Sequence, residues 1–162
     1  MAADPHGLVE AFVTMLNEHD PDLVEEFVAA DYINHNVFVP DGREANRRFW
    51  ASFFTALPDL TATAEDVVVC GDRVVGRFTY RGTHRGEFMG IGATGRPIEM
   101  RSIDIWRVQN GLFAEHWDEL NTLQVLAQMV ALANQPVTAN QPVTANQPVT
   151  PNQPGTDVGG AA

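Results

Sequence analysis

The first third of the chain has apolar residues at helical spacing and predicts three helices. The first covers residues 7–17. The second begins at Asp20-Pro21, because aspartate caps helix N-termini and proline suits the first helical position. The third covers residues 41–57 and carries a broad aromatic side. Residues 31–40, between the second and third helices, lack a clear period and are expected to be irregular.

After Pro58 the apolar period changes to two, which predicts strands. Helices followed by strands indicate the α+β class. A strongly curved, mostly antiparallel sheet would wrap around about three N-terminal helices as a cone-shaped barrel, with a pocket between sheet and helices. Glycine-rich residues 82–96 form a long connection within the sheet. The predicted strands and a short closing helix are Leu60–Cys70, Arg73–Arg81, Pro97–Gln109, Leu112–Asn121 and, for the helix, Thr122–Leu132.

A change of composition near Ala133 predicts a domain boundary. Residues 133–162 repeat the hexapeptide ANQPVT three times and contain only isolated valines as larger apolar residues. Proline at this spacing prevents helix formation, and no core can form from so few apolar side chains. We therefore predict one domain over residues 1–132 and a disordered, low-complexity tail over 133–162 with some polyproline-II character. A docking motif and a spacer are alternative roles for the tail.

The charge balance limits the partners that the protein could bind. The chain has 162 residues, with 21 acidic and 10 basic residues and a net charge of −11. Nucleic acids and anionic membrane surfaces both need a positive footprint, so neither is an expected partner. The N-terminus lacks the basic and apolar stretches of an export signal, and a cytoplasmic location is expected.

The cysteine and histidine content argues against several kinds of site. Cys70, the single cysteine, cannot form an internal disulfide and is predicted to lie in the core because it ends the apolar run VVVC. The five histidines are dispersed and lack metal-ligand spacing. No glycine-rich loop has the strand and helix context of a phosphate-binding site. We therefore predict no metal and no cofactor.

The turn at Asn110-Gly111 decides which side chains of the last two strands share a face. A two-residue turn would pair Gln109 with Leu112 and place the acidic residues of the two strands on opposite faces. A three-residue loop would pair Val108 with Leu112 and gather them on one face. We predict the three-residue loop, because it brings the unusual polar groups together.

In this register Asp104 lies opposite His116, and Asp118 follows on the same face. Facing or diagonal neighbours in a sheet have β-carbons roughly 5–8 Å apart, so the three side chains can interact. Two carboxyls and an imidazole in a half-dry pocket would shift one another's pKa toward the range needed for acid–base catalysis. The alternative explanations are a solvated face and a structural Asp–His hydrogen bond.

Further residues are candidates for the lining of such a pocket. Tyr32 could donate a hydrogen bond to a carbonyl oxygen, and His35 could orient a base; both could equally cap the end of a helix or strand. Aromatic and lid residues could form the walls, although an ordinary core or a packed loop would also explain them. These candidates are Trp50, Phe53, His84, Phe88, Met89 and Trp106.

The sequence GEFMGIGATGRPIEMRSIDIWRVQNGLFAEHWDELN, residues 86–121, strongly resembles the SnoaL-like polyketide cyclase family, also labelled ester cyclases. The early stretches DYINHNVF and GREANRRFW are similar to the family's Y-x-x-H segment and the helix that follows it. The resemblance covers about residues 6–130. It implies a nuclear-transport-factor-like cone that is usually dimeric through the outer face of the sheet.

The resemblance also implies a reaction. Characterised cyclases of this family close an aromatic polyketide by an intramolecular aldol step, without a cofactor, using a pocket carboxylate as general acid/base. Asp118 matches that carboxylate, whereas Asp104 stands where the family often has histidine. Our leading hypothesis is a cofactor-independent cyclase of secondary metabolism in which Asp118, with Asp104 and His116, acts on a small apolar or aromatic substrate. A non-catalytic binding protein and an epoxide hydrolase or hydratase remain alternatives.

Overall fold

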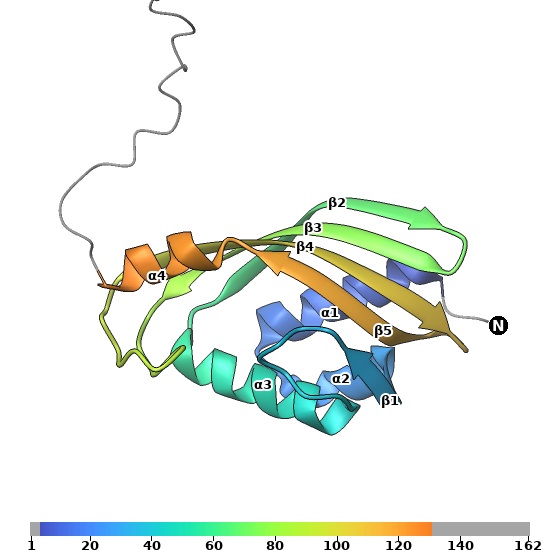
Figure 1. The fold of residues 1–162 in the computed structure, drawn as a ribbon, viewed down its shortest axis with the longest axis horizontal. Coiled ribbons are helices and arrows are strands. Elements are labelled where there is room, and N and C mark those ends of the chain that lie inside the picture. Colours follow the sequence, from blue (N-terminus) through green and yellow to red (C-terminus); the bar gives the residue numbers. More distant parts are fainter. Residues whose placement is uncertain (1–3, 131–162) are drawn as a thin grey trace, which may run out of the picture.

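The computed structural model describes residues 4–130, so the predicted tail and its boundary lie outside the described residues. Helices and strands lie where the apolar pattern predicts them, with differences at the second helix and at one turn (Figure 1). In chain order the elements are α1 (Pro5–Glu18), the 3-10 turn η1 (Pro21–Leu23), α2 (Val24–Phe27), β1 (Val28–Asn34), α3 (Arg43–Ala56), β2 (Thr61–Cys70), β3 (Arg73–Thr83), β4 (Pro97–Gln109), β5 (Leu112–Leu120) and α4 (Thr122–Val130).

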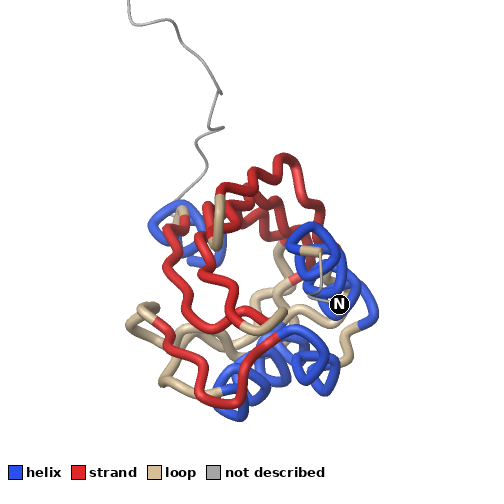
Figure 2. The backbone as a smooth tube through the Cα atoms, turned by 90° about the vertical axis from the view of Figure 1, so that its right-hand side faces the viewer, coloured by secondary structure: helices blue, strands red, loops and turns tan. Residues whose placement is uncertain are grey.

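The sheet has the strand order β1-β5-β4-β3-β2 and curves over α1, α2 and α3 (Figures 1 and 2). The α+β prediction with helices enclosed by a curved sheet is confirmed, and the sheet stays open, with β1 and β2 as its two edges. None of the helices within residues 4–130 is long and apolar enough to cross a membrane.

The segment after Asp20 differs from the prediction. Asp20 does cap a helical turn, with its side chain accepting from the backbone N–H of Asp22 at 3.1 Å. Only η1 and the single turn α2 follow, and the chain then enters β1, which pairs in parallel with β5. The sheet therefore has five strands rather than four. Burial along β1 does not alternate, since Val28 and Tyr32 are its buried residues, and a period-two pattern could not mark it.

The hairpin between β4 and β5 also corrects the predicted register. Asn110 and Gly111 have φ angles of 54° and 79°, which belong to a two-residue turn, and Gln109 pairs with Leu112. The pairing then shifts by one residue, because Ala114 is an extra residue in β5 and forms a β-bulge. The predicted three-residue loop is wrong.

The bulge determines which β5 side chains face the helices. Beyond it Trp106 pairs with His116, and Asp104 pairs with Asp118 rather than with His116. Regular pairing of the same sequence from the two-residue turn, with no bulge, would have placed Asp104 opposite Trp117. The two carboxyls therefore share the concave face, as predicted, for a different structural reason.

Alternation along β2 explains the position of Cys70. The core prediction for this residue is wrong: Cys70 is exposed at the end of β2, next to the turn into β3. Its apolar run alternates between half-buried and exposed residues, because only one side of β2 meets the helices. An apolar run at a sheet edge is thus not evidence that every residue in it is buried.

Aromatic packing fixes the helices against the concave face. The ring of Phe12 on α1 lies 5.4 to 6.1 Å, between centroids, from the rings of Phe27, Trp50, Phe78 and Trp106. Edge-to-face contacts of this kind are favourable beyond the area that they bury. The core thus joins all three enclosed helices to β3 and β4.

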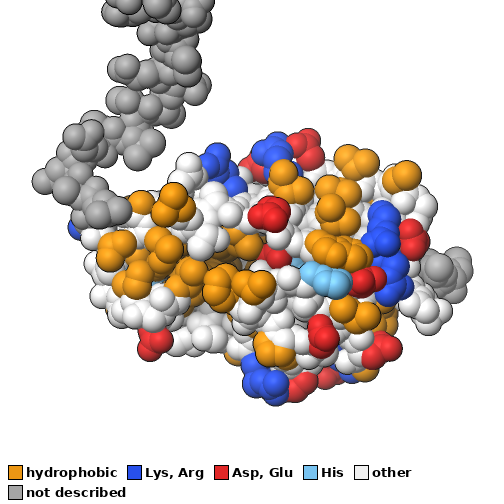
Figure 3. Space-filling view, viewed as in Figure 1, with side chains coloured by type: hydrophobic (Ala, Val, Ile, Leu, Met, Phe, Trp, Pro, Cys, Tyr) orange, Lys and Arg blue, Asp and Glu red, His pale blue; other side chains and the backbone are white. Residues whose placement is uncertain are grey.

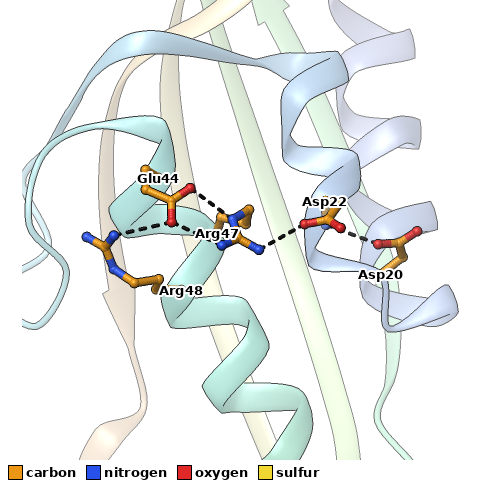
Figure 4. Close-up of polar contacts among 5 residues, drawn as sticks. All are labelled: Asp20, Asp22, Glu44, Arg47 and Arg48. Carbon is orange, nitrogen blue, oxygen red and sulfur yellow. Dashed lines mark hydrogen bonds and ion pairs between the residues drawn. The ribbon is translucent and has the colours of Figure 1, made fainter.

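Charged contacts join the start of α3 to η1 at the surface (Figure 4). The guanidinium of Arg47 donates to Asp22 and to Glu44, each with an N–O distance of 2.9 Å. Glu44 also accepts from Arg48 at 3.2 Å. Exposed ion pairs of this kind contribute little to stability.

Candidate active site

A cavity of about 290 Å³ lies between the concave face of the sheet, α3 and the connection after β3. Its walls are mainly apolar and aromatic: Phe38, Val39, Phe49, Trp50, Phe53, Phe88, Met89, Met100, Leu120 and Val125. Within residues 4–130 the polar lining contains acidic, amide, hydroxyl and imidazole groups but no Arg or Lys: Asn34, Asn36, Asn46, Ser52, Tyr80, Glu87, Ser102, Asp104, His116, Asp118 and Thr122. Apolar walls with a few convergent polar groups are typical of small-molecule sites.

His116 is held between two acceptors on the floor of this cavity. Its Nε2 lies 2.9 Å from Asp104 Oδ1, and its Nδ1 lies 3.2 Å from Asn34 Oδ1. The Asn34 oxygen also accepts from the backbone N–H of Asn36 at 3.0 Å, which fixes it as an acceptor. Nδ1 of His116 therefore carries a hydrogen and donates it to Asn34.

Asp104 is engaged through both of its oxygens. Oδ1 faces His116, and Oδ2 accepts from the hydroxyl of Ser102. The hydroxyl of Tyr80 in turn lies 3.1 Å from Ser102 Oγ. Burial, with a smaller effect from the negative charge of Asp104, raises the pKa of Tyr80 well above its usual value, so the phenol stays protonated and donates. A buried chain from Tyr80 through Ser102 and Asp104 to His116 results.

Asp118 is less constrained and more accessible to a ligand. Its Oδ2 accepts from the side-chain amide of Asn36 at 2.7 Å, and no other side-chain partner within residues 4–130 lies at hydrogen-bonding distance. Desolvation raises the pKa of this carboxyl, and the positive charge of His116 and the Asn36 hydrogen bond oppose that shift. The negative charge of Asp104 raises the pKa further. Asp118 is thus a half-buried carboxyl with increased basicity, next to an apolar cavity.

Asp104, His116 and Asp118 also have ligand atoms within 4.8 Å of one another, a spacing that suits a metal ion. Both nitrogens of His116 already face hydrogen-bond acceptors, and Asp104 is bound to Ser102. A metal would have to replace the His116–Asp104 contact. The donor set therefore fits a hydrogen-bonded Asp104–His116 pair with Asp118 beside it better than a metal centre.

Seven of the sequence-predicted site residues line the cavity: Asp104, His116, Asp118, Trp50, Phe53, Phe88 and Met89. Tyr32 and Trp106 lie behind them, at a second cavity of about 30 Å³ that Asp104, Asn46 and His116 also border. Their rings stack on His116, with centroids 6.2 and 5.3 Å from the imidazole. Tyr32 and Trp106 thus support the imidazole of His116 and do not line the main cavity.

The other two predicted residues lie away from the main cavity. His35 follows β1 and faces outward, where it stacks on Trp117 at 4.8 Å and its Nε2 lies 3.0 Å from Glu115 Oε1. His84 is fully buried beside Thr94, with Nδ1 3.0 Å from the threonine hydroxyl. Neither side chain borders the cavity that contains Asp118.

Asn36, Tyr80 and Asn46 are among the polar residues of the cavity that were not identified from the sequence. Asn36 belongs to the segment that was expected to be irregular, and its contact with Asp118 joins residues 82 positions apart. Tyr80 lies two residues after the buried Phe78 on β3, and residues two apart on a strand point to the same side, so this spacing signals its inward direction. Asn46 lies one helical turn before Trp50 on the aromatic side of α3, and that spacing could have identified it.

Comparisons with known proteins agree with this geometry. The family model described as SnoaL-like polyketide cyclase matches residues 6–129. The chain belongs to this family. A search of curated proteins gave no significant match.

Solved structures of this family and fold overlay on the chain. TsrD from Streptomyces laurentii is 36% identical over 78% of this chain and 95% of its own, with a TM-score of 0.74. IdmH from Streptomyces antibioticus, described as a candidate polyketide cyclase, is 34% identical over 78% of this chain and 99% of its own, with a TM-score of 0.66. AclR from Streptomyces galilaeus, described as a candidate hydroxylase, is 26% identical over 82% and 84%, with a TM-score of 0.71.

Proposed function

We propose that this SnoaL-like protein is a cofactor-independent aldol cyclase that uses Asp118 as its general base and acid. The observation that carries the proposal is the contrast between the two inward carboxyls. Asp104 is engaged through both oxygens, whereas Asp118 has a raised pKa and one amide partner, and it borders the aromatic cavity. Asp118 is therefore the carboxyl that is free to exchange a proton with a ligand.

The proposed steps conserve protons without any further reagent. The Asp118 carboxylate removes a proton from a carbon activated by neighbouring carbonyl groups, and the C–H electrons form an enolate. The enolate carbon attacks a second carbonyl carbon of the same molecule and forms the new C–C bond. The resulting alkoxide then takes the proton back from the Asp118 carboxylic acid. His116, fixed by Asp104 and Asn34, supplies a nearby positive charge that favours the ionised form of Asp118.

The cavity favours a neutral, largely flat substrate. Trp50 and Phe53 form its helix-side wall, and Phe88 packs edge-to-face on Phe53 with centroids 5.2 Å apart. Among residues 4–130 no Arg or Lys lines it, and the carboxyls of Asp104 and Asp118 disfavour an anionic ligand. A small apolar or aromatic polyketide-like molecule matches these walls.

We also propose a homodimer through the outer face of the sheet, in a cytoplasmic protein. Ile103 and Ile105 on β4 are 51% and 38% exposed, and Trp117 lies beside them on the same face. Hydrophobic side chains are visible over the β5 side of the molecule, bordered by charged ones (Figure 3). Apolar sheet faces of this kind are candidates for association. Sedimentation analysis of the full chain tests the dimer.

The acid–base proposal is tested with 2-tetralone, a bicyclic ketone whose α-protons exchange with deuterium in D₂O. We expect the protein to accelerate this exchange, observed by proton NMR, because Asp118 can remove the α-proton. Asp118→Asn should lower the protein-dependent rate by about 100-fold or more, the usual contribution of a general base. EDTA should leave the rate unchanged.

Unchanged exchange in Asp118→Asn would contradict the role of Asp118. Saturable binding of 2-tetralone to the wild-type protein, without any exchange, would favour the binding-protein alternative. Circular dichroism of the variant checks that its fold is retained.

A further inference from the structure

Asn46 presents an amide whose orientation is fixed by a neighbour on the same helix. The side chain is 7% exposed, and its Oδ1 accepts from the indole Nε1 of Trp50 at 3.1 Å. An indole N–H can only donate, so the amide oxygen has to face it. The NH₂ group of Asn46 is consequently turned away from Trp50.

This NH₂ group belongs to a residue that lines the cavity. The group has no hydrogen-bond acceptor within residues 4–130. Among the side-chain nitrogen and oxygen atoms of those residues, only His84 Nε2 is both inaccessible to solvent and without a hydrogen-bond partner. The Asn46 nitrogen is therefore not sealed in the core. Asn46 borders both the main cavity and the smaller one behind His116. A buried donor without a protein partner is costly unless water or a ligand accepts from it.

The opposite wall of the cavity makes this donor chemically distinctive. Asp118 and Asp104 project from the sheet, and their negative charges disfavour a second negative charge nearby. Asn46 projects from α3, and the amide of Asn36, another donor at the cavity, is already bound to Asp118. A ligand held between sheet and helix would thus meet a base on one side and a neutral N–H donor on the other.

We propose that the Asn46 amide binds the carbonyl oxygen of the substrate while Asp118 acts on the adjacent carbon. The ligand class is a neutral ketone, ester or amide carbonyl attached to a ring that packs on Trp50. When the α-proton moves to Asp118, the C–H electron pair moves to the carbonyl oxygen. Asn46 keeps its own proton, and its hydrogen bond strengthens as the oxygen gains charge. The catalytic part of this inference rests on the proposed function, whereas carbonyl binding can be measured separately.

The experiment compares the binding of 2-tetralone with that of tetralin, the hydrocarbon of the same shape without the oxygen. Asn46→Leu removes the donor and should weaken 2-tetralone binding about tenfold, as expected for one lost hydrogen bond, with less than a twofold effect on tetralin. Thr55→Ala, at an exposed position of the same helix, is the matched control and should affect neither ligand.

Asn46→Asp gives a result that a merely structural role would not produce. An ionised carboxylate still accepts from Trp50 but offers no donor, so ketone binding should be weak. Below the pKa of the new carboxyl its O–H can donate, and ketone affinity relative to tetralin should recover as pH falls. Asn46→Leu should show no such recovery, and the wild-type protein provides the reference at each pH.

An NMR measurement on the wild-type protein guards against variants that fail to fold. The side-chain NH₂ signal of Asn46 should shift on addition of 2-tetralone and stay in place with tetralin. Equal shifts with both ligands, or equal losses of affinity in Asn46→Leu, would overturn the proposal. Because these readouts report binding, carbonyl discrimination without proton exchange would refute the cyclase proposal and leave the Asn46 assignment supported.

Discussion

Glu115 and Asp118 lie three positions apart on β5, and the fold shifts the pKa values of their carboxyls in opposite directions. Hydrogen bonds from His35 and Arg107 lower the pKa of Glu115 on the outer face. Desolvation raises the pKa of Asp118 on the concave face. Odd spacing on a strand places the two residues on opposite sides of the sheet. One strand therefore carries two carboxyls whose pKa values are shifted in opposite directions, and the surroundings of each explain its direction.

The same contrast holds for the ion pairs of the two faces. Outside, Arg107 Nε lies 2.7 Å from Glu115 Oε2, with both side chains partly exposed. Inside, His116 Nε2 lies 2.9 Å from Asp104 Oδ1, with both side chains buried. Similar N–O distances thus have different energetic consequences, because water replaces a lost partner readily on the outer face and less readily where both side chains are buried.

Breaking the inner pair should have the largest effect. His116→Leu leaves the Asp104 carboxylate buried with only Ser102 as a partner, and we expect a loss of about 3 kcal/mol in the free energy of unfolding. Urea denaturation followed by fluorescence measures it. The double variant His116→Leu/Asp104→Leu should recover part of the loss, since no charge is then left unpaired; an equal or greater loss would contradict the buried-charge explanation.

The raised pKa of Asp118 predicts a dependence of stability on pH. The folded state holds the Asp118 proton more tightly than the unfolded state, so its contribution to stability falls as pH rises from the ordinary aspartate value through the raised one. Asp118→Asn should remove this slope and make the protein relatively more stable than wild type at neutral pH. Thermal denaturation of both proteins across pH tests it, and parallel curves would contradict the assignment.

The exchange rate should show the opposite trend in the same pH window. Only the ionised carboxyl can remove a proton, so the rate should rise as Asp118 titrates above its ordinary range.

The smallest effect is expected on the outer face. Glu115→Gln removes the charge that pairs with Arg107 and His35, where solvent replaces the lost contacts. We expect the urea midpoint and the 2-tetralone exchange rate to remain within experimental error of wild type. A clear loss of exchange would show that the two faces are coupled, and the comparison between them would then fail.

Much of this architecture could be predicted from the sequence, because most of it depends on local periodicity. The long strands and the helices α1, α3 and α4 follow from the spacing of their apolar residues. The choice of Asp118 as a candidate site residue follows from the motif EHWD. β1 could not be predicted in this way, since its parallel pairing with β5 joins segments roughly 80 residues apart and its burial does not alternate.

The candidate site was predictable where a strand or helix alone directs the side chain. His35 illustrates the limit: its neighbour Asn34 binds His116 inside, and adjacent residues of an extended chain point to opposite sides. The direction of His35 therefore depends on where β1 joins the sheet. Asn36 was missed for the same reason, because its partner Asp118 is distant in sequence.

Because of the bulge at Ala114, the number of residues between the hairpin turn and the site does not determine which side chains of the site face one another. Asp104 faces Asp118, and Trp106 faces His116, on the far side of a residue that has no partner in β4. An in-frame deletion of Ala114 would restore regular pairing and leave those partners unchanged. The hairpin can therefore gain or lose one residue during evolution while the acid–base groups stay in place, so the distance from the turn is a poor guide for aligning distant relatives.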